Sequence, residues 1–161
     1  MSTPTIRRVR GVLALCTLLA AACGDDTGTT VVLPARLRPG TWYIHEANGD
    51  TLPAEIGRRT VGIAQEITYI DSATITIVAG GTWQQKVFLR MTLNGATDRQ
   101  ELFYDQGNWA AGSVGYTLVS TIRSRSTAVT MGSSTLMNTT ESLLSWTAAP
   151  TVTGAYRTTP P

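Results

Sequence analysis

Few side chains in this chain can do chemistry, and they form no known catalytic pattern. His45 is the only histidine, so a Ser-His-Asp triad would have to use it. No G-x-S-x-G elbow accompanies it. His45 adjoins Glu46 and alternates with Trp42 and Ile44, so we expect it to be exposed or at the rim of the fold. The sequence therefore predicts that the protein is not an enzyme.

The acidic and basic residues suggest no site either. Spacing brings no two carboxylates together, so we interpret them as surface charges; they are Glu66, Asp71, Asp98, Glu101 and Asp105. One histidine and scattered carboxylates predict no metal site and no cofactor. We interpret Arg123-Ser124-Arg125 as solvated charges beside a turn, with an anion-holding pair as the alternative.

Cys23 is the residue with the clearest predicted chemistry. Arg7, Arg8 and Arg10 precede an apolar run, 11–22, which has the length of a secretory signal and is too short to span a bilayer. Small residues just before Cys23 resemble a bacterial lipobox, which implies cleavage at that cysteine and acylation of its thiol. Ordinary secretion is the alternative, because Ala20-Ala21-Ala22 also satisfies the A-x-A rule and predicts the same cut.

A lipidated Cys23 implies a stable membrane anchor, because such a cysteine carries more than one acyl chain. The predicted location is the cell envelope, facing the periplasm. Gly24 rather than Asp follows Cys23, which by proteobacterial sorting rules favours the outer membrane. Once Cys16 leaves with the signal peptide, Cys23 is the only cysteine, so no intramolecular disulfide can form.

The charge of the predicted mature chain argues against binding to nucleic acid. Without the three arginines of the signal, ten basic residues face eleven acidic ones. A nearly neutral domain has no electrostatic attraction for a polyanion. We therefore predict a membrane contact through the anchor and no nucleic-acid partner.

Composition divides the chain into four segments. We predict a signal peptide at 1–22, a lipidated cysteine with a flexible tether at 23–39, a β domain at 40–157 and a disordered tail at 158–161. The tether is polar at first and contains two prolines, as flexible linkers often do. The domain is large enough to bury a core of its own.

Within the domain, hydrophobic residues recur with a period of two. In 82–93, for example, Trp83, Val87 and Leu89 share one face, with Phe88 as an apolar exception on the other. We expect strands over these ranges: 41–47, 60–70, 74–77, 82–93, 100–105, 115–123, 126–131, 134–146 (as one strand or as a broken one) and 151–157. Short helical turns could form at 53–58 or 97–103.

Turn residues separate the expected strands and suggest short hairpin links. Gly80-Gly81 and Asn94-Gly95 suit positions of positive φ, and Gly107-Asn108 also looks like a turn. Short links between consecutive strands favour an all-β antiparallel meander barrel of about eight strands. A β-sandwich is the alternative.

Three segments resemble bacterial lipocalin-like lipoproteins. Residues 39–43 read Pro-Gly-Thr-Trp-Tyr, like the G-x-W of a first lipocalin strand, and 47–53 resemble the "NGxxLP" segment that follows it. Residues 153–157 resemble the last strand. The resemblance implies that Arg157 lies over Trp42 and plugs the barrel floor through a cation–π contact.

The tryptophans are the residues best suited to form a binding site. We predict that Trp83, Trp109 and Trp146 are the candidates for ligand or partner contact, although Trp83 and Trp146 also suit a core. The lipocalin resemblance implies a cup for a small apolar or amphipathic ligand. The alternative is a structural lipoprotein that docks another envelope protein without a small-molecule ligand.

Overall fold

The computed structural model describes residues 36–146 and 149–161. The predicted signal peptide, Cys23 and most of the predicted tether lie outside these residues. Leu37 is buried and its backbone N–H donates to the Tyr116 hydroxyl at 3.0 Å. The packed domain thus includes residues ahead of the first strand.

The described chain is all-β. Its strands are β1 (Gly40–Ala47), β2 (Asp50–Thr51), β3 (Ala54–Val61), β4 (Ala64–Val78), β5 (Thr82–Leu93), β6 (Ala96–Ala111), β7 (Tyr116–Ser120), β8 (Ser126–Met131), β9 (Leu136–Glu141) and β10 (Val152–Arg157). All neighbouring strands pair antiparallel, and each strand from β4 to β10 pairs with the next one along the chain.

Strand β1 closes this sheet into a barrel. Its first half, 40–43, pairs with 74–77 of β4, and its second half pairs with β10. A bulge between Ile44 and Glu46 lets β1 bend from one neighbour to the other. The result is a closed eight-stranded antiparallel meander barrel with two extra strands, β2 and β3, which confirms the predicted fold class over the sandwich.

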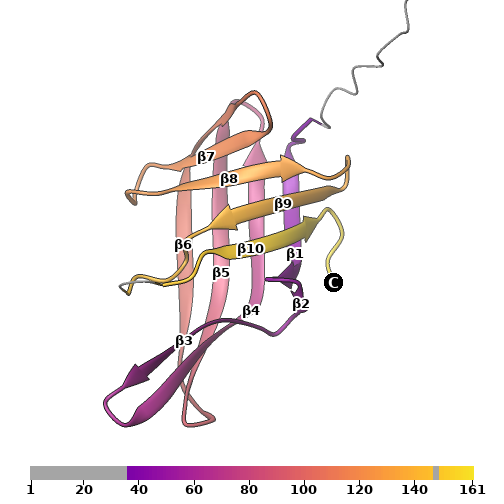
Figure 1. The fold of residues 1–161 in the computed structure, drawn as a ribbon. Helices are drawn as coiled ribbons and strands as arrows, with labels where there is room; N and C mark the ends of the chain where they lie inside the picture. Colours follow the sequence, from indigo (N-terminus) through magenta and orange to yellow (C-terminus); the bar gives the residue numbers. More distant parts are fainter. Residues whose placement is uncertain (1–35, 147–148) are drawn as a thin grey trace, which may run out of the picture. The chain divides into compact units, whose positions relative to one another are not determined.

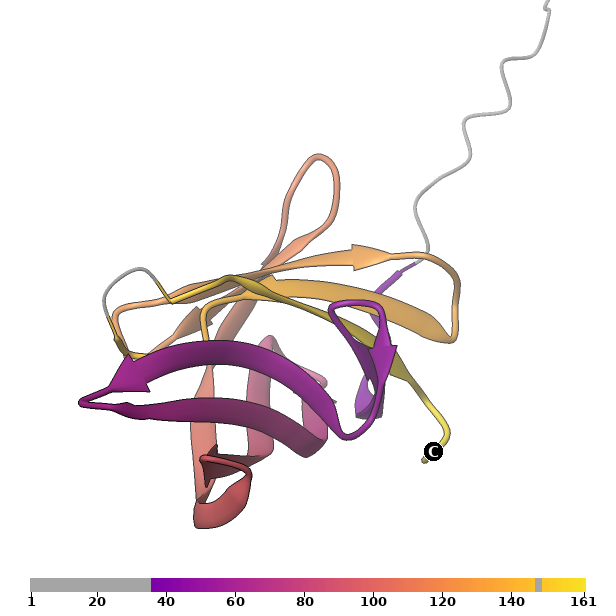
Figure 2. The same ribbon diagram turned by 60° about the horizontal axis from the view of Figure 1, so that its bottom comes forward.

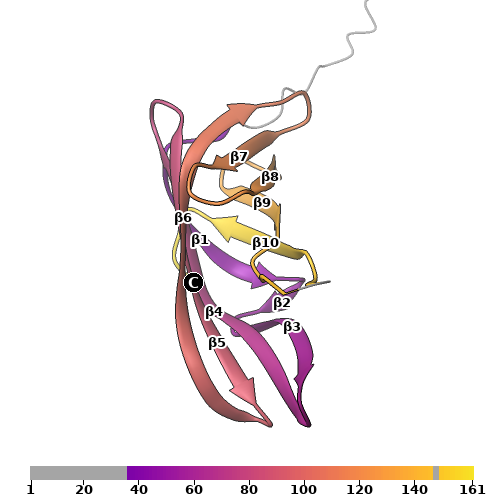
Figure 3. The same ribbon diagram turned by 90° about the vertical axis from the view of Figure 1, so that its left-hand side faces the viewer.

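The barrel has two layers and an open extension. Strands β7–β10 run across the direction of β4–β6 (Figure 1), and the two groups face each other when viewed from the side (Figure 3). Strands β4–β6 are far longer than β7–β10 and continue beyond them, where β3 replaces β1 as the partner of β4. We call the concave end between this extension and β7–β10 the mouth of the barrel.

Side chains fill the barrel interior. Inward residues of the two layers interdigitate, and the largest fully buried ones include Trp42, Trp83, Tyr156, Ile75, Leu118 and Met137. Each of these is at most 1% exposed. Burial of large apolar side chains contributes roughly 1.5–3 kcal/mol apiece, so this packing stabilises the closed end of the barrel. The interior is a core rather than an empty cup.

Some local predictions were wrong. The expected strand 60–70 is interrupted by a hairpin turn at Gly62, whose φ is 63°, so it divides between β3 and β4. The expected helical turns at 53–58 and 97–103 are strand, because each pairs with a long neighbouring strand. Gly107-Asn108 lies inside β6 rather than in a turn.

Gly107 has a packing role that explains its position within a strand. A Cβ at this residue would lie 1.9 Å from the carbonyl oxygen of Val119, on the adjacent strand β7. Only glycine allows β7 to approach here. The predicted hairpins at Gly80-Gly81 and Asn94-Gly95 are present, and all four residues have positive φ.

Candidate functional site

The predicted barrel plug is not assembled. Trp42 is 1% exposed and its indole N–H donates to the carbonyl of Arg38 at 3.2 Å. Arg157 pairs in register with Tyr43, so it projects from the face opposite Trp42 and is exposed. The neighbouring Tyr156 points inward instead and is fully buried. The resemblance thus located the first and last strands but not the contact between them.

Two of the three candidate tryptophans are structural. Trp83 is 1% exposed and its indole N–H donates to the Asn108 carbonyl at 3.1 Å. Trp109 lies within β6 and packs edge-on against Tyr116, with 5.8 Å between ring centroids. Trp83 is thus part of the core, whereas Trp109 is partly buried and its indole N–H has no hydrogen-bond partner among the described residues.

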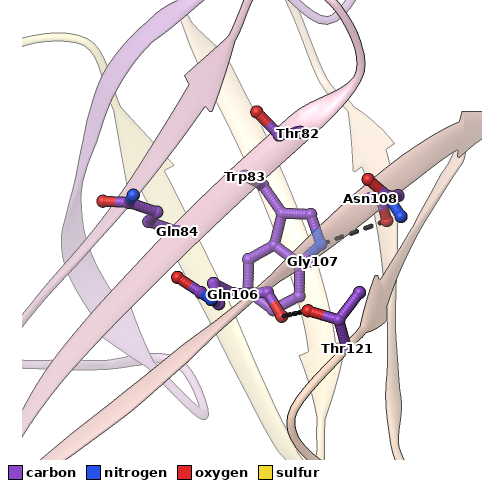
Figure 4. A pocket seen from close by; sticks show the side chains of 7 residues that line it. All are labelled: Thr82, Trp83, Gln84, Gln106, Gly107, Asn108 and Thr121. Carbon is purple, nitrogen blue, oxygen red and sulfur yellow. Dashed lines mark hydrogen bonds between the residues drawn. The ribbon is translucent and has the colours of Figure 1, made fainter.

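Trp83 underlies a shallow polar recess on the outer side of β5 and β6. Figure 4 shows the indole beside Gly107, with the amide side chains of Gln84 and Gln106 on the same recess. The recess has a volume of about 280 Å³. Its polar side chains do not converge on one point, so we do not assign a ligand to it.

Trp146 lies at the mouth of the barrel. It belongs to residues 142–146, which follow β9 and which we call the strap. The strap crosses to β3 (Figure 2), where Gly57 provides the space for it. A Cβ at Gly57 would lie 2.6 Å from Leu144 Cδ1 and 3.0 Å from Trp146 Cζ2. The guanidinium of Arg59 stacks on the Trp146 ring at 4.8 Å.

Between the strap and strands β5 and β6 lies a recess of about 230 Å³. Its lining mixes apolar side chains with four charged ones. The lining residues are Arg59, Leu89, Met91, Arg99, Glu101, Leu102, Phe103, Arg123, Leu143, Leu144, Ser145 and Trp146. Such a mixed lining can contact both a charged and an apolar part of one small molecule.

A buried carboxylate forms the floor of the mouth. Glu66 is 3% exposed and accepts hydrogen bonds from Arg59 Nε at 2.7 Å and from Arg99 Nη1 at 3.0 Å. These two guanidiniums lower the pKa of Glu66, with the Arg59 hydrogen bond as the largest cause. The prediction that Glu66 is a surface charge was therefore wrong. We call Glu66, Arg59 and Arg99 the mouth cluster.

A second charged group lies inside the barrel, and sequence reasoning missed it. Arg125 donates to Asp105 through Nε, to Gln85 Oε1 at 2.7 Å and to Glu141 Oε2 at 3.3 Å. Gln85 in turn donates to both Glu141 oxygens, at 3.0 and 2.8 Å. We call Arg125, Asp105, Glu141, Gln85 and Tyr156 the central cluster.

Burial dominates the protonation of the central cluster. Desolvation raises the pKa of Glu141 despite its contacts with Gln85 and Arg125. Desolvation also raises the pKa of the Tyr156 hydroxyl well above its ordinary value of 10.0.

One sequence signal could have found this cluster. Gln85 stands between Trp83 and Val87 on the inward face of β5, where the alternation calls for an apolar residue. A polar residue there needs a buried partner. Asp105 pairs with Gln85 across strands, and both Asp105 and Arg125 were wrongly predicted to be solvated.

The remaining chemical groups do not form a site. His45 Nε2 donates to the Thr159 carbonyl at 2.9 Å, at the edge of the barrel. Among residues 36–146 and 149–161, no three His, Cys, Asp or Glu side chains are placed to hold a metal ion. The same residues contain no helix with the length and apolar character needed to cross a membrane.

The outer face of β5 and β6 carries an exposed apolar pair. Phe88 and Leu102 are cross-strand neighbours, 51% and 54% exposed. They line a recess of about 330 Å³ together with Asp71 and Ser72, near the bulge in β4. The apolar exception noted in the alternation of 82–93 is thus a surface feature.

No protein-family profile, curated protein or solved structure matches this chain. The fold is the likeness that remains: an eight-stranded antiparallel meander barrel, as in lipocalin-like domains.

Proposed function

We propose that this protein is an envelope lipoprotein whose lipocalin-like barrel binds a small amphipathic molecule at its mouth. The recess beneath the strap carries this proposal, because its lining combines apolar and charged side chains. The barrel interior is full, so the ligand lies at the open end and not in a deep cup. A recess of about 230 Å³ suits a short chain or a single ring system.

The proposal of an anchor is supported by the basic, apolar and small residues that precede Cys23. It is tested by mass spectrometry of the amino-terminal peptide from membrane fractions. We expect an acylated Cys23 in the native chain and no acylation in Cys23→Ser. Recovery of the native chain with its leader intact would contradict the anchor.

Ligand binding is tested with exported Cys23→Ser protein, which needs no detergent. Native mass spectrometry would detect a co-purified molecule, and tryptophan fluorescence would report titration with octanol and octanoate. We expect the binding signal to vanish in Trp146→Phe, because Trp146 lines the recess. It should persist in Trp109→Phe, whose ring packs elsewhere. The proposal fails if no molecule co-purifies and no amphiphile changes the fluorescence.

A second candidate function is docking of another envelope protein on the outer face of the barrel. The exposed Phe88–Leu102 pair favours it, since contiguous exposed apolar side chains mark interaction surfaces. A photo-crosslinker at position 102 should then capture one defined envelope protein in cells. The same crosslinker at Ser133, in an exposed turn, is the control.

A further inference from the structure

Three arginines surround the mouth, and they differ in whether a carboxylate of the protein neutralises their charge. This inference rests on the mouth being a ligand site, and it concerns the chemical class of the ligand. Arg59, Arg99 and Arg123 all line the recess. An arginine that already faces a carboxylate offers little to an incoming anion, so the state of each guanidinium decides what the mouth can bind.

Arg59 and Arg99 are neutralised by carboxylates of the protein. Both donate to the buried Glu66. Arg99 also pairs with Glu101 at 3.1 Å and with Asp98 at 3.4 Å. These two guanidiniums line the recess, and carboxylates of the protein already neutralise their charge.

Arg123 differs from both. Among the described residues, no carboxylate lies within ion-pair distance of its guanidinium. Its Nε donates to the Tyr104 carbonyl at 3.2 Å, and its guanidinium stacks on the Phe103 ring at 4.4 Å. These contacts hold the guanidinium at the recess and leave its two terminal NH₂ groups without an acceptor in the described part of the chain.

The loop that carries Arg123 is also held in place. The Arg123 backbone N–H donates to Ser120 Oγ at 2.8 Å, and Ser120 Oγ donates to the buried Asp105 at 2.6 Å. On the far side of Phe103, Arg125 is fully engaged with the central cluster. Arg123 is therefore a positioned cation with free donors, and pre-positioning lowers the entropic cost of binding.

Apolar side chains lie next to this cation within the same recess. Phe103, Leu144 and Trp146 line this recess and are partly exposed, and the buried Leu89, Met91 and Leu143 lie among the same lining residues. A ligand that satisfies both features has an acidic group at one end and a short apolar chain at the other. A neutral molecule would leave Arg123 without an anion, and a cationic one would be repelled by it.

We propose that the mouth selects an amphipathic anion, a dissolved molecule whose carboxylate or phosphate pairs with Arg123 while its apolar chain lies against Phe103, Leu144 and Trp146. The planar guanidinium presents two parallel N–H donors to such a group. Carboxylate and phosphate share this recognition chemistry, and the experiment below separates them.

The test compares eight-carbon amphiphiles that differ only in headgroup. Calorimetric titration of Cys23→Ser protein uses octanoate, octyl phosphate, octanol and octyltrimethylammonium. We expect at least one of the two anions to bind about tenfold more tightly than octanol, as a charge-assisted hydrogen bond would provide. Acetate and inorganic phosphate, which lack the chain, should bind far more weakly.

Variants assign the effect to Arg123. Arg123→Gln should remove about tenfold of the affinity for the anion and leave octanol binding unchanged. Arg123→Lys should retain part of that affinity, because the charge stays while the paired donors are lost. Arg157→Gln is the matched control, since Arg157 is exposed on β10 and lies outside the recess.

The outcomes separate this inference from the proposed function. If octanol binds as tightly as both anions, the mouth is a ligand site but the selection of an anion is wrong. If no amphiphile binds, the proposed function fails and this inference with it. Binding to phosphatidylglycerol vesicles without binding to dissolved anions would also overturn it, because the acidic group would then belong to a membrane surface.

Discussion

The central and mouth clusters differ in their ratio of arginines to buried carboxylates. In the central cluster one arginine serves two buried carboxylates, Asp105 and Glu141. In the mouth cluster two arginines serve one buried carboxylate, Glu66. Burial is the largest cause of the raised pKa of Glu141, whereas the hydrogen bond from Arg59 is the largest cause of the lowered pKa of Glu66.

The arginines of the two clusters also differ in their exposure to solvent. The Arg125 side chain is 12% exposed, whereas those of Arg59 and Arg99 are 36% and 40% exposed. Ion pairs near water contribute little to stability, while removal of one partner from a buried pair is costly. The central cluster thus belongs to the closed core, whereas the arginines of the mouth cluster are in contact with solvent.

The largest expected effect comes from Arg125→Met. This change leaves Asp105 and Glu141 buried without their cation, and we expect a loss of about 3–5 kcal/mol in the free energy of unfolding. Urea denaturation measures it. Arg123→Met is the control, because that side chain is exposed and faces no carboxylate among the described residues. If both variants lost the same free energy of unfolding, the inferred energetic difference between the central cluster and the mouth would be wrong.

A smaller effect should follow from Gly57→Ala. The added methyl group would lie 2.6 Å from Leu144 Cδ1 and 3.0 Å from Trp146 Cζ2, so the Leu144 side chain must move and the Trp146 ring must adjust. We expect about 1–2 kcal/mol of destabilisation and a change in Trp146 fluorescence. Gly132→Ala is a comparison on the far hairpin, where the nearest atom is the end of the Leu136 side chain at 2.9 Å. An unchanged Trp146 environment in Gly57→Ala would contradict the packing of the strap.

Glu66→Gln should cost about 1 kcal/mol at neutral pH, because its partners are partly solvated. The pKa of Glu66 is lowered from its ordinary value of 4.5, so its ion pairs stabilise the fold above that pH. This contribution is lost as the pH falls through the lowered pKa. Unfolding measured between pH 7 and 3 should show a shallower acid loss in Glu66→Gln than in the native chain.

Glu141→Gln should have the smallest effect at neutral pH, within about 1 kcal/mol, since the amide has nearly the same size and keeps one oxygen acceptor for Gln85 and Arg125. The sign of its pH dependence is opposite to that of Glu66. A raised pKa means that the folded state binds the proton more tightly, so stability falls as the pH rises from 4.5 through the raised pKa. Glu141→Gln should abolish that fall, and an unchanged pH profile would contradict the assignment.

The antiparallel meander was largely predictable, whereas the pairing of β1 with both β4 and β10, which closes the barrel, was not. Strands β5 and β8 begin and end at the predicted residues because turn residues flank them and most of their residues alternate. The segments 53–58 and 97–103 were misassigned for one reason. Each is polar and lies in the extension, where pairing to a long neighbour decides the structure rather than local pattern.

The candidate site was less predictable. Trp146 was identified as a candidate contact and does line the mouth, but Trp83 and Trp109 are occupied by packing. Arg123 and Arg125 are two residues apart and have similar local sequence. Arg123 is exposed at the recess, whereas Arg125 is held in the core. Arg125 is buried because Asp105 and Glu141, on other strands, are placed to pair with it.

The sequence alone determined an alternating pattern of inward and outward side chains, with glycine and asparagine at the hairpins. A period of two and short links leave an antiparallel meander as the compact solution. The tertiary structure decided where charges become buried, since a carboxylate or guanidinium enters the interior only when strands distant in sequence bring its partners. It also decided that the barrel interior is filled and that the recess beneath the strap lies at its open end.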